Sequence, residues 1–323
     1  MSKEQFYRLF RNEMSFEEAQ AFLIGLYQKG EEAQDIEDAT SVMREFLIPL
    51  HLHPALQDKI FDIVGTGGDK SGSFNISSTS AIILASMGIY VAKHGNRSIT
   101  SQSGSADVLE ALGINLSLSL EAQAKMLEEC HFAYLFAANH HPAMKHIMPI
   151  RKSIPHRTIF NMLGPLVNPA GSKRQVIGVF SVDFIPKIAQ ALSRLDTHAS
   201  CVVSSLDGLD EASVSAPTRY AKIHHDQIEY GEIDPQALGI PPHAFEEIKG
   251  GKVPQNAAIT MGILRNEIKG AKRDIILLNS GIAFWTNGNA RDVKEGMEMA
   301  DEALSSLKAL HKLQEIQKVS SSL

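Results

Sequence analysis

The sequence predicts an α/β protein in which a small discontinuous helical domain lies beside a larger α/β domain with a central, mostly parallel sheet. After residue 55, short apolar runs alternate with helical patterns, as in parallel strand–helix units. Residues 1–55 show only helical patterns, and prolines break the alternation across 142–171. We therefore expect 1–55 and 142–171 to form the small domain, and 56–141 and 172–323 the larger one. A cleft between two such domains is a common place for a ligand.

Composition excludes several classes of protein. The chain has 323 residues, 44% of them hydrophobic, which is enough for a substantial core. Its net charge of -6 argues against a nucleic-acid binder, which usually carries a basic excess. Two cysteines without a Cys-x-x-Cys pair exclude a disulfide framework and a cysteine zinc site. The sequence has neither a signal-peptide core nor an apolar stretch of membrane length, so we expect a cytoplasmic protein without a membrane partner.

Two helices are predicted near the N-terminus. Ser15 and Glu18 have the spacing of a capping box ahead of an apolar face, and Gly30 provides a helix stop. A second helix carries its apolar face between residues 36 and 47 and ends before Pro49. These helices begin the small domain.

The remaining elements follow from apolar runs and amphipathic segments. A helix is expected to start near Thr79 and to stop at Gly88. The predicted strands are 60–64, 89–92, 133–136, 175–180, 199–204 and 274–278. Further helices are predicted at 105–112, 121–130, 185–194, 256–268 and 290–313.

A glycine-rich turn follows the first predicted strand, within Asp62–Thr79. Glycine permits left-handed backbone and close approach of a ligand, and successive N–H groups can form an anion-binding nest. The spacing matches neither a Walker loop nor Gly-x-Gly-x-x-Gly. Two interpretations stay open: phosphate bound at a helix N-terminus, or a tight turn with solvated hydroxyl groups. The glycines and hydroxyl residues concerned are Gly65, Gly67, Gly68, Ser71, Ser73, Ser77, Ser78 and Thr79.

A second polar cluster follows the next predicted strand. Lys93 and Arg97 can hold phosphate charges, while His94 and Asn96 offer directional hydrogen bonds. A second hydroxyl-rich turn then precedes a helix. Strands of an open α/β sheet carry ligands at their carboxyl ends, so two such turns favour a shared ligand over two ordinary solvated loops. The residues of the second turn are Ser101, Ser103, Gly104 and Ser105.

Two adjacent acids, Asp210 and Glu211, follow the predicted strand 199–204. Gly208 indicates a loop, from which both side chains can reach one site. Mg²⁺ commonly binds through one or two carboxylates together with substrate phosphates. Acidic pairs on loops are usually only solvated, so the magnesium interpretation depends on the two phosphate-like turns.

The proline-rich segment adds a possible acceptor site. Arg151 lies within it, and a guanidinium group can clamp a carboxylate with two hydrogen bonds. Residues 161–169 form a turn-rich wall, for which packing and ligand contact are equally good interpretations.

These clusters, in this order, resemble the anthranilate phosphoribosyltransferases, a family of tryptophan biosynthesis. The resemblance covers nearly the whole chain. It implies a small helical domain plus a larger α/β domain, a homodimer, the substrates phosphoribosyl pyrophosphate (PRPP) and anthranilate, and Mg²⁺, with two ions expected. The matching segments are Gly65–Asp69, Asn75–Ser78, Lys93–Arg97, Ser103–Asp107, His141–Lys145, Arg157–Pro165 and Gly208–Glu211.

By resemblance, each group of residues has an implied role, and no residue is assigned as a certain acid, base or nucleophile. The implied metal ligands are Ser77, Asp210 and Glu211. The implied anthranilate-binding residues are Gly65, His94, Asn96, His141, Arg151 and Gly164. The implied PRPP-binding residues are Gly65, Gly68, Asp69, Ser73, Asn75, Ser77, Ser78, Lys93, Ser101 and Ser105.

Several positions depart from the family pattern. Ser73 and Ser78 stand where threonine is more frequent, and both keep the hydroxyl group. Gln102 stands where lysine or another polar residue is common, and Ala138 replaces a frequent proline. We expect the chain to lack most of the family's first helix, which usually contributes to the dimer.

Two rival functions stay open at this point. A pyrimidine nucleoside phosphorylase shares the architecture and the phosphate loop, but it is typically longer and does not need the pair Asp210–Glu211. A non-catalytic nucleic-acid-binding relative would carry a basic surface and an eroded acidic pair. The net charge of -6 and the intact acids argue against the second rival.

Overall fold

The computed structural model describes residues 3–69, 71–97 and 103–323. Its centre is a seven-stranded sheet of order β3-β2-β1-β4-β5-β6-β7. The strands β1 to β5 pair in parallel, and β6 and β7 add an antiparallel hairpin at one edge. The strand bounds are β1 Ile60–Gly65, β2 Tyr90–Gly95, β3 Phe132–Phe136, β4 Arg174–Gly178, β5 Ala199–Ser205, β6 Thr218–His224 and β7 Gln227–Ile233.

The strand order reverses between β1 and β4. The chain moves from β1 outward to β2 and β3, and then returns to place β4 on the other side of β1. Open α/β sheets bind ligands at such a switch point, in the crevice beyond the carboxyl ends of the strands. The sheet topology therefore points to the residues that follow β1 and β4.

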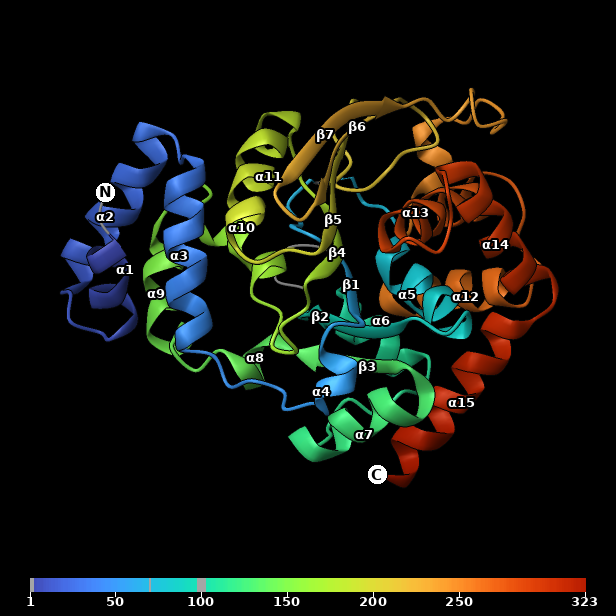
Figure 1. Ribbon diagram of the computed structural model, residues 1–323, viewed down its shortest axis with the longest axis horizontal. Helices are drawn as coiled ribbons and strands as arrows, with labels where there is room; N and C mark the ends of the chain where they lie inside the picture. Colours follow the sequence, from blue (N-terminus) through green and yellow to red (C-terminus); the bar gives the residue numbers. More distant parts are fainter. Residues whose placement is uncertain (1–2, 70, 98–102) are drawn as a thin grey trace.

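Helices cover both faces of the sheet. Figure 1 shows α1, α2, α3 and α9 gathered at one end of the molecule, with α10 and α11 between them and the sheet. Helices α5, α12, α13 and α14 lie on the opposite side. The long helices are α1 Lys3–Phe10, α2 Phe16–Lys29, α3 Ala33–Glu45, α5 Ile76–Ser86, α7 Leu120–Cys130, α9 Met144–Ser153, α11 Ile185–Arg194, α12 Val253–Leu264, α13 Ala271–Asn287, α14 Val293–Ser305 and α15 Lys308–Ser322. Shorter helices are α4 Pro54–Gln57, α6 Ser105–Ala111, α8 Ala137–His140 and α10 Phe160–Leu163.

The buried apolar residues form two clusters. One cluster joins α5, α13 and α15 to β1, β2 and β3. The other joins the N-terminal helices to the segment 147–167, as the prolines indicated, but it also includes α11 and one face of β4, β5 and β6. Helix α11 thus belongs to the same apolar cluster as α3. The residue bounds of the two domains stay a prediction.

The structure corrects two sequence predictions and adds one hairpin. Residues 274–278 are not a strand but part of α13. The predicted final helix 290–313 is two helices, α14 and α15, separated at Leu307, whose φ of 62° is left-handed. The hairpin of β6 and β7 was not predicted at all. The capping box at Ser15, the stop at Gly30 and the other five strands are confirmed to within a few residues.

Candidate active site

The glycine turn after β1 lies directly under Asp210. The backbone N–H of Gly67 donates a 2.6 Å hydrogen bond to Asp210 Oδ2. A Cβ atom at Gly65 would come within 2.5 Å of that same oxygen, so the carboxylate requires glycine there. Gly67 and Gly68 have φ values of 68° and 85°, in the left-handed region that glycine adopts without strain. The acid therefore points toward the mouth of the turn.

A further glycine at the end of β4 makes room for the acidic loop. A Cβ atom at Gly178 would overlap the backbone carbonyl of Asp210. Gly178 also pairs with Gly65 across the two strands, and its carbonyl accepts from Thr66 N at 2.9 Å. The switch point between β1 and β4 is therefore lined by two glycines, with the acidic loop seated on both. The sequence interpretation missed Gly178, for which the only local signal is a lone glycine at the end of an apolar run.

Glu211 and Lys93 meet at the first turn of α5. Glu211 Oε1 accepts a 2.9 Å hydrogen bond from Ser77 N, one of the helix donors that has no partner inside the helix. Lys93 Nζ donates to Ser77 Oγ at 3.2 Å and to Ile63 O at 2.7 Å. These hydrogen bonds join four elements: β1, β2, α5 and the acidic loop. The ends of the two neighbouring strands therefore lie close together, as the prediction of one shared ligand requires.

The electrostatics of the acids call for a cation. Burial, with repulsion by Asp69, raises the pKa of Asp210 to about 8. Burial and the nearby Asp210 also raise the pKa of Glu211 well above its ordinary value. Burial lowers the pKa of Lys93. Neither Asp210 nor Glu211 forms a salt bridge with any residue that the structure describes.

The acids do not form a complete metal site by themselves. Over 3–69, 71–97 and 103–323, no three histidine, cysteine, aspartate or glutamate side chains gather in a way that could hold an ion. Asp69 Oδ1 accepts from Ser71 N at 3.1 Å, and its Oδ2 accepts from Asp210 N at 3.4 Å. Mg²⁺ ordinarily completes its coordination with water and substrate oxygens, so two carboxylates beside the glycine turn, the predicted phosphate site, fit that ion.

The hydroxyl turns carry several of the predicted PRPP-binding residues. Asn75 is the N-cap of α5, and its Oδ1 accepts from Ser103 Oγ at 3.3 Å. Ser78 is buried in the first turn of α5, and its Oγ has no hydrogen-bond partner among the described residues. Ser73 forms an isolated bridge with Lys249. Ser101 and Gln102 lie outside the described residues.

Ser105 and Asn96 lie together at the end of β2. Ser105 Oγ is 2.9 Å from the hydroxyl of Tyr134 and donates to Asn96 O at 3.3 Å. Arg97 was predicted as a candidate for phosphate charges, but its guanidinium contacts Asp107 at 3.0 Å and Glu110 at 2.6 Å. Arg97 therefore ties the loop after β2 to helix α6.

A pair of neutral histidines joins β2 to the proline-rich segment. His94 Nδ1 is 3.1 Å from Gly164 O, and His94 Nε2 is 3.2 Å from His141 Nε2. Burial lowers the pKa of His94 to about 3 and that of His141 to about 4. Both rings are therefore uncharged at neutral pH, and three of the predicted anthranilate-binding residues are in contact.

Arg151 is a partly buried cation with no anion beside it. Its guanidinium lies 5.2 Å from the ring centre of Phe160, and Nη1 is 3.6 Å from the sulfur of Met148. Burial lowers the pKa of Arg151 to about 10. The described residues place no carboxylate within salt-bridge distance of it, whereas Arg157 is held by Glu31 at 2.8 Å. Among the described residues, Arg151 makes no hydrogen bond with His94 or His141.

Buried asparagines support the site from behind. Asn168 Nδ2 donates at 2.8 Å to Asp62 Oδ2 and at 2.8 Å to Ala92 O, which ties β1 to β2. Asn279 on α13 accepts from Ala212 N at 3.0 Å and donates to Ala212 O at 2.8 Å, directly after Glu211. The sequence analysis did not identify Asn279 or Asn256, because a single polar residue in an apolar helix carries no local signal of its distant partner.

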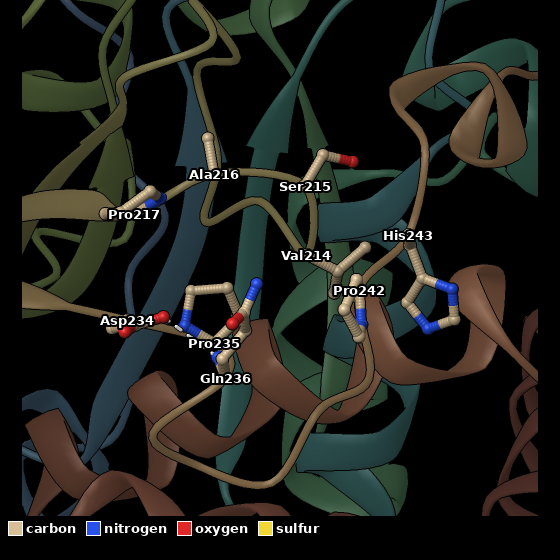
Figure 2. Close-up of a pocket in the computed structure, with 9 residues that line it drawn as sticks. All are labelled: Val214, Ser215, Ala216, Pro217, Asp234, Pro235, Gln236, Pro242 and His243. Atoms are coloured by element: carbon tan, nitrogen blue, oxygen red, sulfur yellow. Dashed lines mark hydrogen bonds between the residues drawn. The ribbon is translucent and has the colours of Figure 1, made fainter.

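Figure 2 shows a cavity of about 210 Å³ that lies between residues 214–217 and 234–243. His243 lines it, with Nε2 held 2.7 Å from Asp274 Oδ2. A second hollow of about 380 Å³ lies beside Trp285. None of the predicted site residues lines either of these two spaces, so the site is defined by the contacts at the strand ends.

Comparison with known proteins identifies the class of protein. Residues 57–310 match the family model described as "Glycosyl transferase family, a/b domain". Two similar relatives are the anthranilate phosphoribosyltransferases of Rubrobacter xylanophilus and Chromobacterium violaceum. The first is 41% identical over 93% of this chain and 86% of its own length, and the second 42% identical over 96% and 90%. The chain belongs to the anthranilate phosphoribosyltransferase family.

Solved structures agree with this membership. The anthranilate phosphoribosyltransferase of Thermus thermophilus superposes with a TM-score of 0.92 at 36% identity, covering 99% of this chain and 96% of the other. The Saccharomyces cerevisiae enzyme in complex with PRPP and Mg superposes with a TM-score of 0.86 at 27% identity, covering 95% of this chain and 86% of the other. The same yeast enzyme in complex with 4-fluoroanthranilate gives 0.85 at 26% identity over 95% and 86%.

Proposed function

We propose that this chain transfers the phosphoribosyl group of PRPP to the amine of anthranilate and releases pyrophosphate, a step of tryptophan biosynthesis. The observation that carries the proposal is the pair of the buried Asp210 and the half-buried Glu211, which lies over the glycine turn after β1 without a salt-bridge partner among the described residues. The family membership and the ligands of the yeast structures support the same activity. No helix among the described residues is long and apolar enough to cross a bilayer. We also propose a cytoplasmic location.

The diphosphate side is the part of the site that we assign to PRPP. Backbone N–H groups of the turn and the N-terminus of α5 can bind anionic oxygens. Lys93 adds a positive charge in the same place. The residues that we assign to this diphosphate side are Gly65, Gly68, Asp69, Ser73, Asn75, Ser77, Ser78, Lys93 and Ser105.

We assign Ser77, Asp210 and Glu211 as the residues that hold Mg²⁺, with two ions in the complete complex. Asp210 is buried, and Asp69, Asp210 and Glu211 bring like charges together, so a cation would relieve the repulsion. Ser77 lies between Glu211 and Lys93. When bound, Mg²⁺ supplies positive charge to the diphosphate as it leaves.

The acceptor side comprises Gly65, His94, Asn96, His141, Arg151 and Gly164, and we assign it to anthranilate. The guanidinium of Arg151 is partly buried and has no carboxylate partner in the described chain, which suits the anthranilate carboxylate. The neutral histidines hold the wall at Gly164 in place. They place no charge beside an aromatic amine.

The chemistry proposed for these residues is orientation and electrostatics. The amine nitrogen forms a bond to C1 of the ribose, while the bond from C1 to the diphosphate oxygen breaks and its electron pair leaves with pyrophosphate. The sugar becomes oxocarbenium-like as the leaving group departs. The amine loses its proton after attack, so no strong base is needed, and rate enhancement comes from holding the two substrates together and stabilising developing charge.

We also propose a homodimer, and the division into 1–55 with 142–171 and 56–141 with 172–323. The continuous second apolar cluster supports the pairing of the N-terminal helices with the segment 147–167.

The proposed function is tested by mixing purified protein with Mg²⁺, PRPP and anthranilate, and following the loss of anthranilate fluorescence. The loss is expected only when all three are present. Fluorescence that stays constant would overturn the proposal. Phosphorolysis of thymidine or uridine would favour a nucleoside phosphorylase, and a salt-sensitive gel shift with DNA would favour a nucleic-acid-binding relative.

A further inference from the structure

Asn75 lies where three segments meet on the diphosphate side. Its Oδ1 accepts one hydrogen bond from Ser103 Oγ at 3.3 Å and another from Asn256 Nδ2 at 3.1 Å. An amide oxygen has two lone pairs, so both are used. The Asn75 amide nitrogen donates no hydrogen bond to any described residue. One end of this amide is therefore occupied and the other is available.

The orientation of Asn256 follows from a backbone donor. Asn256 Oδ1 accepts from Gly251 N at 2.7 Å, and a backbone N–H can only donate. The other branch of the Asn256 amide is then the nitrogen, which faces Asn75 and donates to it. Asn256 is 1% exposed, so water cannot take over either partner. The chain of bonds from Gly251 through Asn256 sets which end of Asn75 faces away.

The turn that carries Gly251 packs against the loop between β1 and α5. Gly250 N donates to Gly72 O at 2.9 Å, and Lys249 bridges Ser73. A Cβ atom at Gly250 would lie 2.7 Å from the Cα of Phe74, so only glycine allows this approach. Asn256, in the first turn of α12, is thus held at a defined position relative to the loop that contains Asn75.

We propose that Asn256 is a positioning residue that keeps the Asn75 amide nitrogen directed toward PRPP. An outward nitrogen donates to an anionic phosphate or a ribose oxygen, whereas a flipped amide would present its own lone pairs to that anion. The inference rests on the proposed function, because PRPP is the ligand that Asn75 is assigned to bind. It adds a residue from α12 to a site otherwise built from the strand ends.

The substitution Asn256→Asp separates the two roles of this side chain. A carboxylate still accepts from Gly251 N, but it cannot donate to Asn75, whose amide is then expected to flip. We expect the Kd for PRPP with Mg²⁺ to rise about 10- to 100-fold, the range for a lost hydrogen bond to a charged group, while the KM for anthranilate stays the same. Asn266→Asp adds the same charge beyond the other end of α12, and it should leave the Kd unchanged.

A double-mutant cycle distinguishes orientation from charge repulsion. In an Asn75→Ala background, Asn256→Asp should weaken PRPP binding no further, because there is no amide left to orient. Equal weakening in both backgrounds, or an unchanged Kd in Asn256→Asp alone, would overturn the inference while leaving the proposed function intact. Wild-type protein that binds no PRPP would overturn both.

The neutral variant Asn256→Ala provides the same test if Asn256→Asp does not fold. It should also raise the Kd for PRPP, by less than Asn256→Asp, since Asn75 can then take either orientation. An unchanged Kd in folded Asn256→Ala would count against the positioning role.

Discussion

The diphosphate side and the acceptor side of the site bury opposite kinds of group. On the diphosphate side, burial raises the pKa values of the acids Asp210 and Glu211, and repulsion by Asp69 adds to the rise in both. On the acceptor side, His94 and His141 are bases whose pKa values are lowered by burial. Arg151 is a base of the same side and keeps its charge beside Phe160.

This difference in buried groups shows which charge each side needs from its ligand. The acids are costly to bury as anions, and neither forms a salt bridge in the described chain, although Lys93 lies near Glu211. The diphosphate side is therefore completed by further positive charge. The histidines are already satisfied by each other and by Gly164, so the acceptor side needs only the partner of Arg151. The predictions that follow test this contrast, beginning with the largest effect.

The largest effect is expected from Asp210→Ala combined with Glu211→Ala. Turnover should fall on the order of 100-fold or more, because the residues proposed to hold Mg²⁺ beside the leaving group are gone. The fold should remain, since the substitution removes two acids whose charges are costly to bury beside Asp69. Steady-state kinetics and thermal unfolding of the ligand-free protein check both halves of this prediction.

A matched control removes two acids elsewhere. Glu229→Ala with Glu232→Ala takes the same charge from the exposed hairpin strand β7 and should leave turnover unchanged. Wild-type rates in the Asp210 and Glu211 double variant would remove the metal role from the diphosphate side.

The second effect concerns the glycine under the acidic loop. Gly178→Ala places a methyl group against the Asp210 carbonyl and should shift the loop away from the turn. We expect a loss of about 1–3 kcal/mol in unfolding free energy from the overpacking, and at least about 10-fold more Mg²⁺ for half-maximal rate. Urea unfolding and a Mg²⁺ titration of the rate measure the two effects.

Gly25→Ala is the control for a glycine that nothing approaches. A Cβ atom at Gly25 in α2 meets nothing within 4 Å, so alanine should raise stability by about 0.5–1 kcal/mol without changing the Mg²⁺ requirement. If Gly178→Ala behaved like Gly25→Ala, the close seating of the acidic loop on β4 would be wrong.

The third effect belongs to the acceptor side. Arg151→Ala should raise the KM for anthranilate about 10-fold or more, the range for a lost charge-assisted hydrogen bond, while the KM for PRPP stays the same. Lys152→Ala removes an exposed positive charge from the next residue of α9 and should change neither constant. An unchanged anthranilate KM in Arg151→Ala would exclude this residue from the acceptor side.

Local composition explains which parts of the fold could be predicted. The strands β1 to β5 are short apolar runs between turn residues, which a buried parallel strand requires. Residues 274–278 are equally apolar but continue into a helix of 17 residues, and such a run does not distinguish a buried strand from a buried helix. The hairpin β6–β7 is half exposed and rich in charged residues, so its pattern resembles a solvated loop.

The site residues also differ in how far they could be predicted from local sequence. Gly65 and Asp210 stand in recognisable local motifs, and the structure brings them together. Gly178 and Asn256 act through segments distant in sequence: Asn256 is separated from Asn75 by 181 positions. Contacts of that range depend on the strand order and on helix packing, which no local pattern contains.

The last effect is a pH dependence on the acceptor side. The folded protein holds His141 neutral with its pKa at about 4, against 6.5 for an ordinary histidine. The stability from this group is therefore present above pH 6.5 and is lost as the pH falls toward 4, because only the unfolded chain takes up the proton. Between pH 7 and pH 5 the loss is about 2 kcal/mol for one such histidine.

The variant His141→Gln, which does not titrate, should lose less unfolding free energy over that range than the wild type does. Urea unfolding at pH 7 and at pH 5 measures the difference, and His311→Gln on the exposed surface of α15 should keep the wild-type slope. An identical slope in His141→Gln would mean that this ring is not held neutral by burial. The contrast between a diphosphate side of buried acids and an acceptor side of buried neutral bases would then fail on the acceptor side.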